Sequence, residues 1–119
     1  MTALDFSICF PVPENIQDAK FMGKTIEEGN FSRIWIPDES TWRSAYQTSA
    51  IIGEHTRSIK FGPGLTNPYT RHPVVTGVEM ATLHTDFNCR GIIGIGPGDY
   101  HFLQSLGTVS YTHLTLPTN

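Results

Sequence analysis

The order of apolar runs predicts an α/β protein built from four successive strand–helix units. Short runs of strand length alternate with longer stretches whose apolar residues recur at helical spacing. The connections between them are short, so we expect parallel strands joined by right-handed crossover helices. A doubly wound sheet and a (β/α) barrel both fit this order, and the pattern alone does not separate them.

The first unit starts with a compact apolar run at residues 6–12, which is typical of a strand buried on both faces. The helix that follows has its apolar residues at helical spacing. These residues are Ile16, Ala19, Met22 and Ile26. Glu14 near its start, and Gly29 with Asn30 at its end, match the usual start and stop signals of a helix.

The second and third units repeat this pattern. Residues 32–37 (SRIWIP) form the second predicted strand, and residues 58–61 form the third. A helix over residues 44–56 joins them, and a helix over residues 73–83 follows, with Pro73 in its first turn. The predicted apolar faces of these two helices are Ala45, Thr48, Ile51 and Ile52, and Val74, Val78, Ala81 and Leu83.

The fourth unit consists of a strand over residues 90–95 and the start of a helix over residues 100–106. Gly-Pro-Gly follows the third strand at residues 62–64 and the fourth strand at residues 96–98. Glycine allows a backbone to approach a ligand closely. Because α/β proteins keep their sites at the carboxyl ends of parallel strands, we expect the functional site at these two loops.

Composition excludes several classes of function. The chain has 119 residues, of which 39% are hydrophobic, as expected for one small globular domain. Its eight Lys and Arg are scattered and its net charge is -3, which does not favour nucleic acid as a partner. No run reaches the roughly 18 apolar residues of a membrane span. The first residues lack a secretory signal, so a cytoplasmic protein is expected.

The cysteines and histidines give no sign of a metal site. Cys9 and Cys89 lie far apart in apolar contexts, and we interpret them as reduced, buried thiols. The five histidines have no ligand spacing with cysteines or carboxylates, so no metal is expected.

The last residues do not continue the pattern. Residues 109–118, VSYTHLTLPT, can be back-translated into a string that resembles the transposon-end adapter used to prepare sequencing libraries. Scars of this kind are left out of fold reasoning. We therefore expect residues 108–119 to be a non-native tail. Residues 1–107 are then expected to be the N-terminal half of a domain, ending inside its fourth strand–helix unit.

Four motifs between residues 60 and 99 stand in a specific order. They are GPGLTNPYTRHP (residues 62–73), ATL (81–83), Arg90 and GIGPGD (94–99). In this order they resemble the bacterial luciferase-like family of flavin and deazaflavin enzymes, and within it the methylenetetrahydromethanopterin reductase-like proteins. Two Gly-Pro-Gly loops at this separation, with TNPYTRHP between them, are specific for the family.

The resemblance implies a TIM (β/α)8 barrel, of which this chain supplies about four βα units and is truncated after them. It implies coenzyme F-420, an 8-hydroxy-5-deazaflavin, or FMN as the cofactor, bound over the carboxyl ends of the strands. A small organic molecule is the implied substrate. Because relatives commonly pair, the resemblance also implies a homo-oligomeric parent enzyme.

Cofactor-binding positions follow residue by residue from the resemblance. The family carries a non-proline cis peptide after the third strand, behind the cofactor ring, and this bond falls at Gly64-Leu65 here. Thr66 and Asn67 are then placed at the polar edge of the ring, or they simply cap the loop before Pro68.

The second Gly-Pro-Gly loop has two readings. Gly96, Pro97 and Gly98 either lie against the cofactor ring and its phosphate or form a structural turn. Asp99 is implied to face the active site as a catalytic proton donor, and the alternative is that it caps the next helix.

After the second strand, the resemblance places Asp38 against the ring. It makes Glu39 a catalytic acid at a position where relatives often have His. Trp42 packs over the ring or fills the top of the barrel. Cys9 stands where methanopterin-specific reductases have Glu, which argues against methylenetetrahydromethanopterin as the substrate.

Three functional hypotheses follow. The first is hydride transfer between a reduced deazaflavin and a small organic substrate, with Glu39 or Asp99 managing the proton. The second keeps the fold but is an FMN-dependent monooxygenase that uses O2. In the third, the chain as written is inactive, because half a barrel leaves two unpaired strand edges and an open apolar core.

Overall fold

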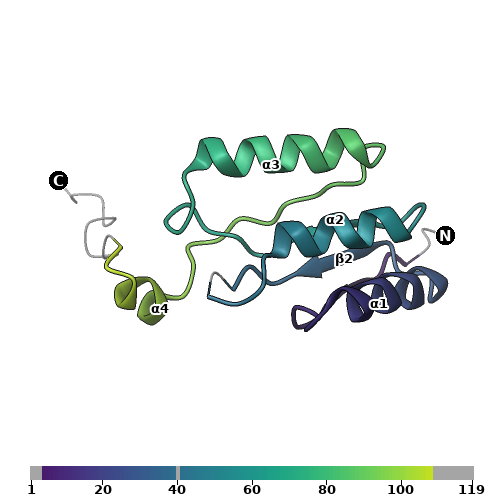
Figure 1. Cartoon of the computed structure of the whole chain (residues 1–119), viewed down its shortest axis with the longest axis horizontal. Coiled ribbons are helices and arrows are strands. Elements are labelled where there is room, and N and C mark those ends of the chain that lie inside the picture. Colours follow the sequence, from purple (N-terminus) through teal and green to yellow (C-terminus); the bar gives the residue numbers. More distant parts are fainter. Residues whose placement is uncertain (1–3, 40, 109–119) are drawn as a thin grey trace.

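The computed structural model describes residues 4–39 and 41–108 (Figure 1). Strands and helices alternate through most of this part of the chain. The elements are β1 (Ser7–Cys9), α1 (Ile16–Glu28), β2 (Arg33–Ile36), α2 (Ala45–His55), β3 (Lys60–Pro63), α3 (Pro73–Asp86) and α4 (Tyr100–Ser105). The tail predicted to be non-native lies outside the described residues, except for its first residue, Thr108.

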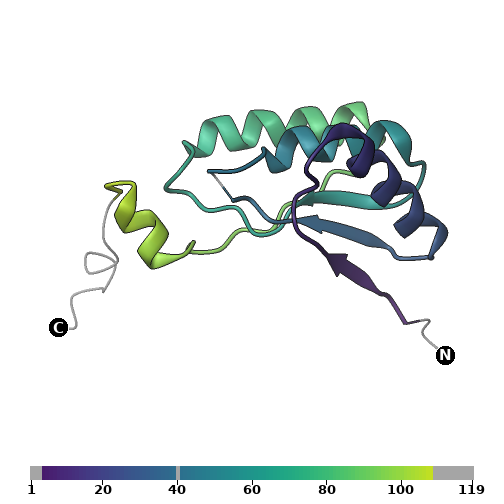
Figure 2. The same cartoon turned by 60° about the horizontal axis from the view of Figure 1, so that its bottom comes forward.

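The strands form a parallel sheet in the order β1-β2-β3. Residues 91–95 lie on the far side of β3, through parallel bridges from Phe61 to Gly91 and from Thr66 to Ile95. Helices α1, α2 and α3 all lie on one side of the sheet (Figure 2). The α/β prediction is confirmed. Doubly wound sheets reverse their strand order and carry helices on both faces, so the uninterrupted order fits a (β/α) barrel instead.

The fourth predicted strand, residues 90–95, is not a continuous strand. Between the two bridges, β3 and its extension have four residues (62–65), whereas the opposite segment has three (92–94). One extra residue on one side of a pair is a β-bulge, and it interrupts the ladder. The segments approach closely at Gly62, where an added Cβ would lie 1.7 Å from the carbonyl oxygen of Ile92. This position therefore requires glycine.

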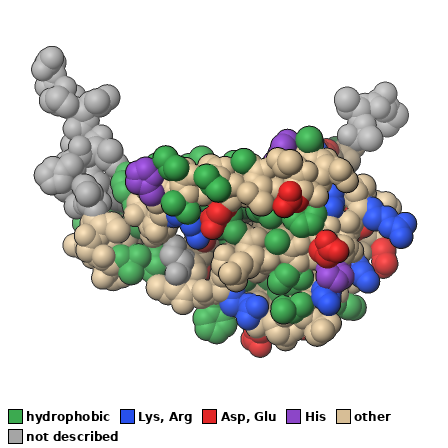
Figure 3. All heavy atoms as spheres, turned by 45° about the horizontal axis from the view of Figure 1, so that its top comes forward, with side chains coloured by type: hydrophobic (Ala, Val, Ile, Leu, Met, Phe, Trp, Pro, Cys, Tyr) green, Lys and Arg blue, Asp and Glu red, His purple; other side chains and the backbone are tan. Residues whose placement is uncertain are grey.

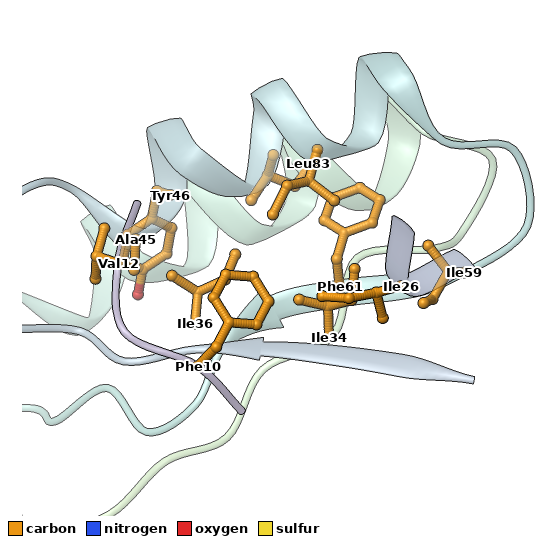
Figure 4. Close-up of a cluster of buried hydrophobic side chains, with 11 residues drawn as sticks. Phe10, Val12, Ile26, Ile34, Ile36, Ala45, Tyr46, Ile59, Phe61 and Leu83 are labelled. Atoms are coloured by element: carbon orange, nitrogen blue, oxygen red, sulfur yellow. The ribbon is translucent and has the colours of Figure 1, made fainter. Parts of the chain in front are cut away.

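The core lies between the sheet and the helices (Figure 4). Ile34, Ile36 and Phe61 are fully buried on the helix side of the strands. They belong to one cluster that draws on every layer. Its buried members are Phe10, Val12, Ile26, Ile34, Ile36, Ala45, Tyr46, Ile52, Ile59, Phe61 and Leu83. Burial of apolar side chains at this interface is the main stabilising term of such a fold.

Side-chain caps explain why most helix boundaries match their predictions. Asn15 accepts a hydrogen bond from the amide of Asp18 at the start of α1, and Ser44 accepts one from Gln47 at the start of α2. Such caps satisfy amides that have no partner within the helix. Pro73 stands at the first turn of α3, as predicted.

The loop before β3 is held by Glu27, in the last turn of α1. Its carboxylate accepts hydrogen bonds from the amides of Arg57, Ser58 and Ile59, at 2.7 to 3.1 Å. Burial acts to raise the pKa of Glu27, but these hydrogen bonds lower it to about 2. Because the three amides are engaged, β3 begins at Lys60 and not at residue 58 as predicted.

Arg90 ties the ends of α2 and α3 to the core and is only 8% exposed. A guanidinium has five N–H groups. Those of Arg90 donate five hydrogen bonds of 2.7 to 3.2 Å, to the carbonyl oxygens of Gly53, Thr56, Ile59 and Phe87 and to the Thr56 hydroxyl. Burial lowers its pKa below the usual value, and the charge of Glu27 acts in the opposite direction.

Three predictions of burial are wrong. The first strand, expected over residues 6–12 with both faces buried, spans only Ser7–Cys9, and Ser7 and Cys9 are exposed. In α3, Val74, Val78 and Ala81 are exposed and only Leu83 is buried. Hydrophobic side chains accordingly reach the surface on the side that faces the viewer in Figure 3. The reason is that the described residues place no further element over this side of α3.

Cys9 and Cys89 are free thiols, as predicted, but both are exposed. Cys89 has a φ of 61° and lies in the turn after α3, not in a strand. Cys9 pairs with Trp35, and because Ile34 and Ile36 on either side of Trp35 face the core, Cys9 lies on the other side of the sheet. In the described part of the chain, no helix is long and apolar enough to cross a membrane.

Candidate functional site

The carboxyl ends of β2, β3 and the 91–95 segment meet at one edge of the sheet, as predicted from the two Gly-Pro-Gly loops. The amide of Gly64 donates to the carbonyl of Ile36 at 2.8 Å. Thr66 donates from its hydroxyl to Asp38 Oδ2 at 2.7 Å, and its carbonyl accepts from the amide of Gly96 at 2.9 Å. We call this region the strand-end edge. It brings together Asp38, the residues from Gly64 to Asn67, and Gly96.

The peptide bond between Gly64 and Leu65 is cis, as the resemblance predicted. Gly64 lies against the Trp35 ring, since an added Cβ would be 2.6 Å from a ring carbon. The Leu65 side chain lies over Gly94 and Gly96 and is 61% exposed. Leu65 and Trp35 therefore form an exposed apolar surface at these glycines, on the face of the sheet without helices.

Cys9 borders this surface from the β1 side. Its Sγ donates to the carbonyl oxygen of Gly64 over 3.9 Å, and the residue is exposed. A thiol is a weak donor, so this contact contributes little stability, but it shows where the Cys9 side chain lies. The side chain at residue 9 therefore lies beside the Gly64-Leu65 peptide.

Thr66 and Asn67 are buried, but only the side chain of Asn67 bonds within its own loop, because that of Thr66 reaches Asp38 and α2. Thr66 also accepts a hydrogen bond from the Tyr46 hydroxyl at 3.3 Å. Asn67 Oδ1 accepts from the amides of Tyr69 and Thr70, each at 3.0 Å. For Asn67 this is the loop-capping alternative of the sequence analysis, and such turns are typical of Asn.

Asp38 has a buried carboxylate, whose side chain is 3% exposed. Besides Thr66, its Oδ2 accepts from Arg71 Nη1 at 3.2 Å. Arg71 also lies 3.3 Å from Glu79 through its Nε, and its guanidinium stacks over the Tyr46 ring at 4.2 Å from the centroid. Sequence reasoning missed Arg71, Tyr46 and Glu79. The one available signal was the position of Arg71 in the loop after the third strand.

Glu39 and Asp99 are both exposed, and Asp99 directly follows Gly98, which lies against Asn67. Glu39 follows Asp38 and lines a hollow of about 170 Å³ together with Asp38, Trp42 and Arg71. Trp42 is 62% exposed, so it does not fill the core. Asp99 accepts a hydrogen bond from the amide of Phe102 at 2.7 Å and caps α4, the alternative considered for it.

The second Gly-Pro-Gly loop offers few donors to an anion. The amide of Gly96 is bonded to Thr66, and Pro97 has no N–H. Gly98 has a φ of 79°, a conformation that glycine adopts without strain. An added Cβ at Gly98 would lie 2.9 Å from the buried Leu103 of α4. The geometry therefore gives this loop a structural role as a turn into α4.

Comparison with known proteins agrees with this arrangement. The family of luciferase-like monooxygenases matches residues 5–109 of the chain. The 5,10-methylenetetrahydromethanopterin reductase of Methanolobus tindarius is 32% identical over 104 residues, which are 87% of this chain and 32% of that protein. The enzyme of the same name from Methanopyrus kandleri is 40% identical over 84 residues, which are 71% of this chain and 24% of that protein.

A solved structure shows the same fold. The coenzyme F420 dependent tetrahydromethanopterin reductase from Methanopyrus kandleri superimposes with a TM-score of 0.81 and 35% sequence identity. The match covers 87% of this chain and 30% of that chain. The chain thus spans about a third or less of the length of the relatives that it matches.

Proposed function

The chain belongs to the luciferase-like monooxygenase family, and we propose that it is the first half of a (β/α)8 barrel whose strand-end edge binds coenzyme F420. The complete enzyme is then an oxidoreductase that transfers hydride between this cofactor and a small organic substrate. The similarity to an F420-dependent reductase structure over 87% of the chain carries this proposal.

The residues at the strand-end edge fit a deazaflavin. A flat ring requires an apolar surface, and the Gly64-Leu65 peptide with the Trp35 ring against Gly64 and the exposed Leu65 side chain supplies one. When bound, a deazaflavin supplies a hydride in a two-electron step. Asp38, Thr66 and Asn67 would border the ring, and the turn from Gly96 to Gly98 would limit its extent.

Proton transfer is assigned to the exposed carboxylates. Asp38 Oδ2 accepts hydrogen bonds from Thr66 and Arg71, so this oxygen acts as an acceptor. Glu39 and Asp99 lie at the same edge without being buried, and either can exchange a proton with a substrate held there. The edge itself holds the reacting groups together, which is the main contribution of such a site.

The substrate is proposed to be a small molecule other than methylenetetrahydromethanopterin. Cys9 beside the Gly64-Leu65 peptide, in place of the Glu of methanopterin-specific reductases, supports this view. The parent enzyme is proposed to be a homo-oligomer. The chain of 119 residues alone is proposed to be inactive, because it carries one half of the site.

A second candidate is an FMN-dependent monooxygenase that uses O2. The description of the matching family, luciferase-like monooxygenase, favours it. The apolar surface at Gly64-Leu65 suits either ring system, so cofactor binding must separate the two candidates.

The test uses a hybrid barrel. Residues 5–107 of this chain are joined to the part of the Methanopyrus kandleri reductase that follows its own matching segment, a graft that the 40% identity makes practicable. Fluorescence titration with F420 and with FMN is expected to show binding of F420. Binding of FMN without F420 would overturn the proposal in favour of the monooxygenase.

Single variants of the hybrid then identify the proton-handling residue. Either Glu39→Gln or Asp99→Asn is expected to lower the rate of hydride transfer by about 100-fold or more. Glu54→Gln, at an exposed position of α2, is the matched control and should leave the rate unchanged. Equal rates in all three variants would remove both carboxylates from the mechanism.

A further inference from the structure

We propose that Arg71 is a positioning residue of the strand-end edge, which clamps Asp38 in place through a network with Thr66, Tyr46 and Glu79. This inference rests on the proposed function, because it makes the cofactor site depend on a residue that need not touch the cofactor. We call this set of five residues the Arg71 clamp.

The contacts of Arg71 join three elements of the fold. Its Nη1 donates to Asp38 Oδ2 at the end of β2. Its Nε lies 3.3 Å from Glu79 Oε2 on α3, and its flat face covers the Tyr46 ring in the first turn of α2. The guanidinium therefore links β2, α2 and α3 at the edge where the strands end.

A second chain of hydrogen bonds reaches the same carboxylate oxygen. The Tyr46 hydroxyl donates to Thr66 Oγ1, which donates to Asp38 Oδ2. Tyr46 thus takes part twice, through its ring under Arg71 and through its hydroxyl. Asp38 is held from both sides, and Thr66 is the residue that directly follows the Gly64-Leu65 peptide. A shift of Asp38 would therefore move the apolar surface as well.

Burial explains why Asp38 needs this partner. Its side chain is 3% exposed, and a buried carboxylate is costly unless it is paired and hydrogen-bonded. Glu79 Oε2 is also buried and accepts no hydrogen bond of good geometry among the described residues. In the described part of the chain, Arg71 is the cation within salt-bridge distance of both carboxylates.

Lysine could not replace Arg71 in this arrangement. The clamp uses two different nitrogen atoms and one planar face of the guanidinium. An ammonium group is a single point of charge without a planar face. The structure therefore predicts that charge alone does not preserve the clamp.

The test compares the hybrid barrel with three variants and one control. Arg71→Lys keeps the positive charge and removes the planar guanidinium with its separate nitrogen atoms. Thr66→Val removes the hydroxyl at nearly constant side-chain shape. Thr66→Ser keeps the hydroxyl and removes only the methyl group. Arg57→Lys, at an exposed position in the loop before β3, controls for exchanging arginine for lysine. Two measurements are made: amide hydrogen exchange of residues 64–71 without cofactor, and affinity for F420.

We expect Arg71→Lys and Thr66→Val each to speed exchange and weaken F420 binding by about tenfold or more. Arg57→Lys should stay within about twofold of the unmodified hybrid in both measurements, and Thr66→Ser should keep the exchange rates of residues 64–71 within about twofold. Because both chains end on Asp38, the Arg71→Lys, Thr66→Val double variant should show less than the product of the single effects.

Unchanged exchange in Arg71→Lys would overturn the clamp. Weaker F420 binding with unchanged exchange would also overturn it, because Arg71 would then act by touching the cofactor. If the unmodified hybrid does not bind F420, but Arg71→Lys and Thr66→Val still speed amide exchange of residues 64–71, the proposed function fails while the clamp stands.

Discussion

Replacement of Arg90 by lysine should destabilise the fold strongly, although the charge is kept. Arg90 uses five N–H groups on five acceptors while it is 8% exposed. Lysine has three donors on a single nitrogen and no planar fork. At least two of the five acceptors therefore lose their partner in Arg90→Lys.

The magnitude follows from this count. A buried polar group left without a partner costs about 1–3 kcal/mol. Two such groups therefore cost about 2–6 kcal/mol, and the lower half of this range applies if water reaches one of them. The carbonyl of Gly53 belongs to the last turn of α2, where carbonyls lack helical partners. Loss of its hydrogen bond from Arg90 should therefore also fray the end of that helix.

Urea unfolding of the hybrid barrel, followed by circular dichroism, measures this effect. We expect Arg90→Lys to lower the free energy of unfolding by about 2–4 kcal/mol. The control Arg57→Lys should change it by less than about 0.5 kcal/mol, as is usual for exposed positions. A loss below about 1 kcal/mol in Arg90→Lys would refute the reasoning, since the five bonds would then carry no net stability.

Three further predictions concern other parts of the chain. The pKa of Glu27 is lowered to about 2, so the stability that this carboxylate adds is complete above the ordinary pKa of a glutamate and is lost as the pH falls toward 2. The Glu27→Gln variant should therefore lose less stability on acidification than the unmodified hybrid, and equal acid sensitivity of the two proteins would contradict this. Gly62→Ala places a Cβ 1.7 Å from the Ile92 carbonyl oxygen and should abolish soluble hybrid, whereas Gly77→Ala on α3, with nothing within 4 Å, should stabilise it by about 0.5–1 kcal/mol. The chain of 119 residues expressed alone should aggregate or stay molten, and a sharp cooperative unfolding transition of a soluble monomer would disprove this.

Local signals made most helices predictable. Ser44, Pro73 and Asp99 each stand at a helix start, where their side chains or ring suit the first turn. Such signals involve residues within a few positions of each other, so one sequence reveals them. The strands were located less well, because Glu27 sets the start of β3 from 33 residues before Lys60.

Burial was harder to predict than element type. The apolar spacing of α3 is that of a packed helix, yet Val74 and Val78 are exposed. Spacing shows which side of a helix is apolar but not whether a partner covers that side. Cys9 was misjudged for the same reason, because a strand residue in an apolar run can lie on the uncovered face of the sheet.

The site was predictable where a motif was involved and not where distant residues meet. The cis bond at Gly64-Leu65 followed from the family resemblance. The contact of Arg71 with Asp38 joins positions 33 residues apart, and no spacing in the sequence predicts it. Glu39 and Asp99 were identified through the family resemblance, and their roles as acids are still predictions.

The bulge opposite residues 92–94 changes which side of the sheet each later residue occupies. Phe61 and Pro63 face the helices, and strict alternation would turn Leu65 toward them and Thr66 away. The extra residue reverses this: Leu65 lies over Gly94, and Thr66 reaches Tyr46 on α2. Deleting one residue from 62–65 would leave three residues opposite three, so Thr66 would keep its pairing with Ile95 and its side of the sheet, but the bulge would be lost. The bulge therefore depends on the length of this segment, whereas the close approach at Gly62 depends on the type of residue.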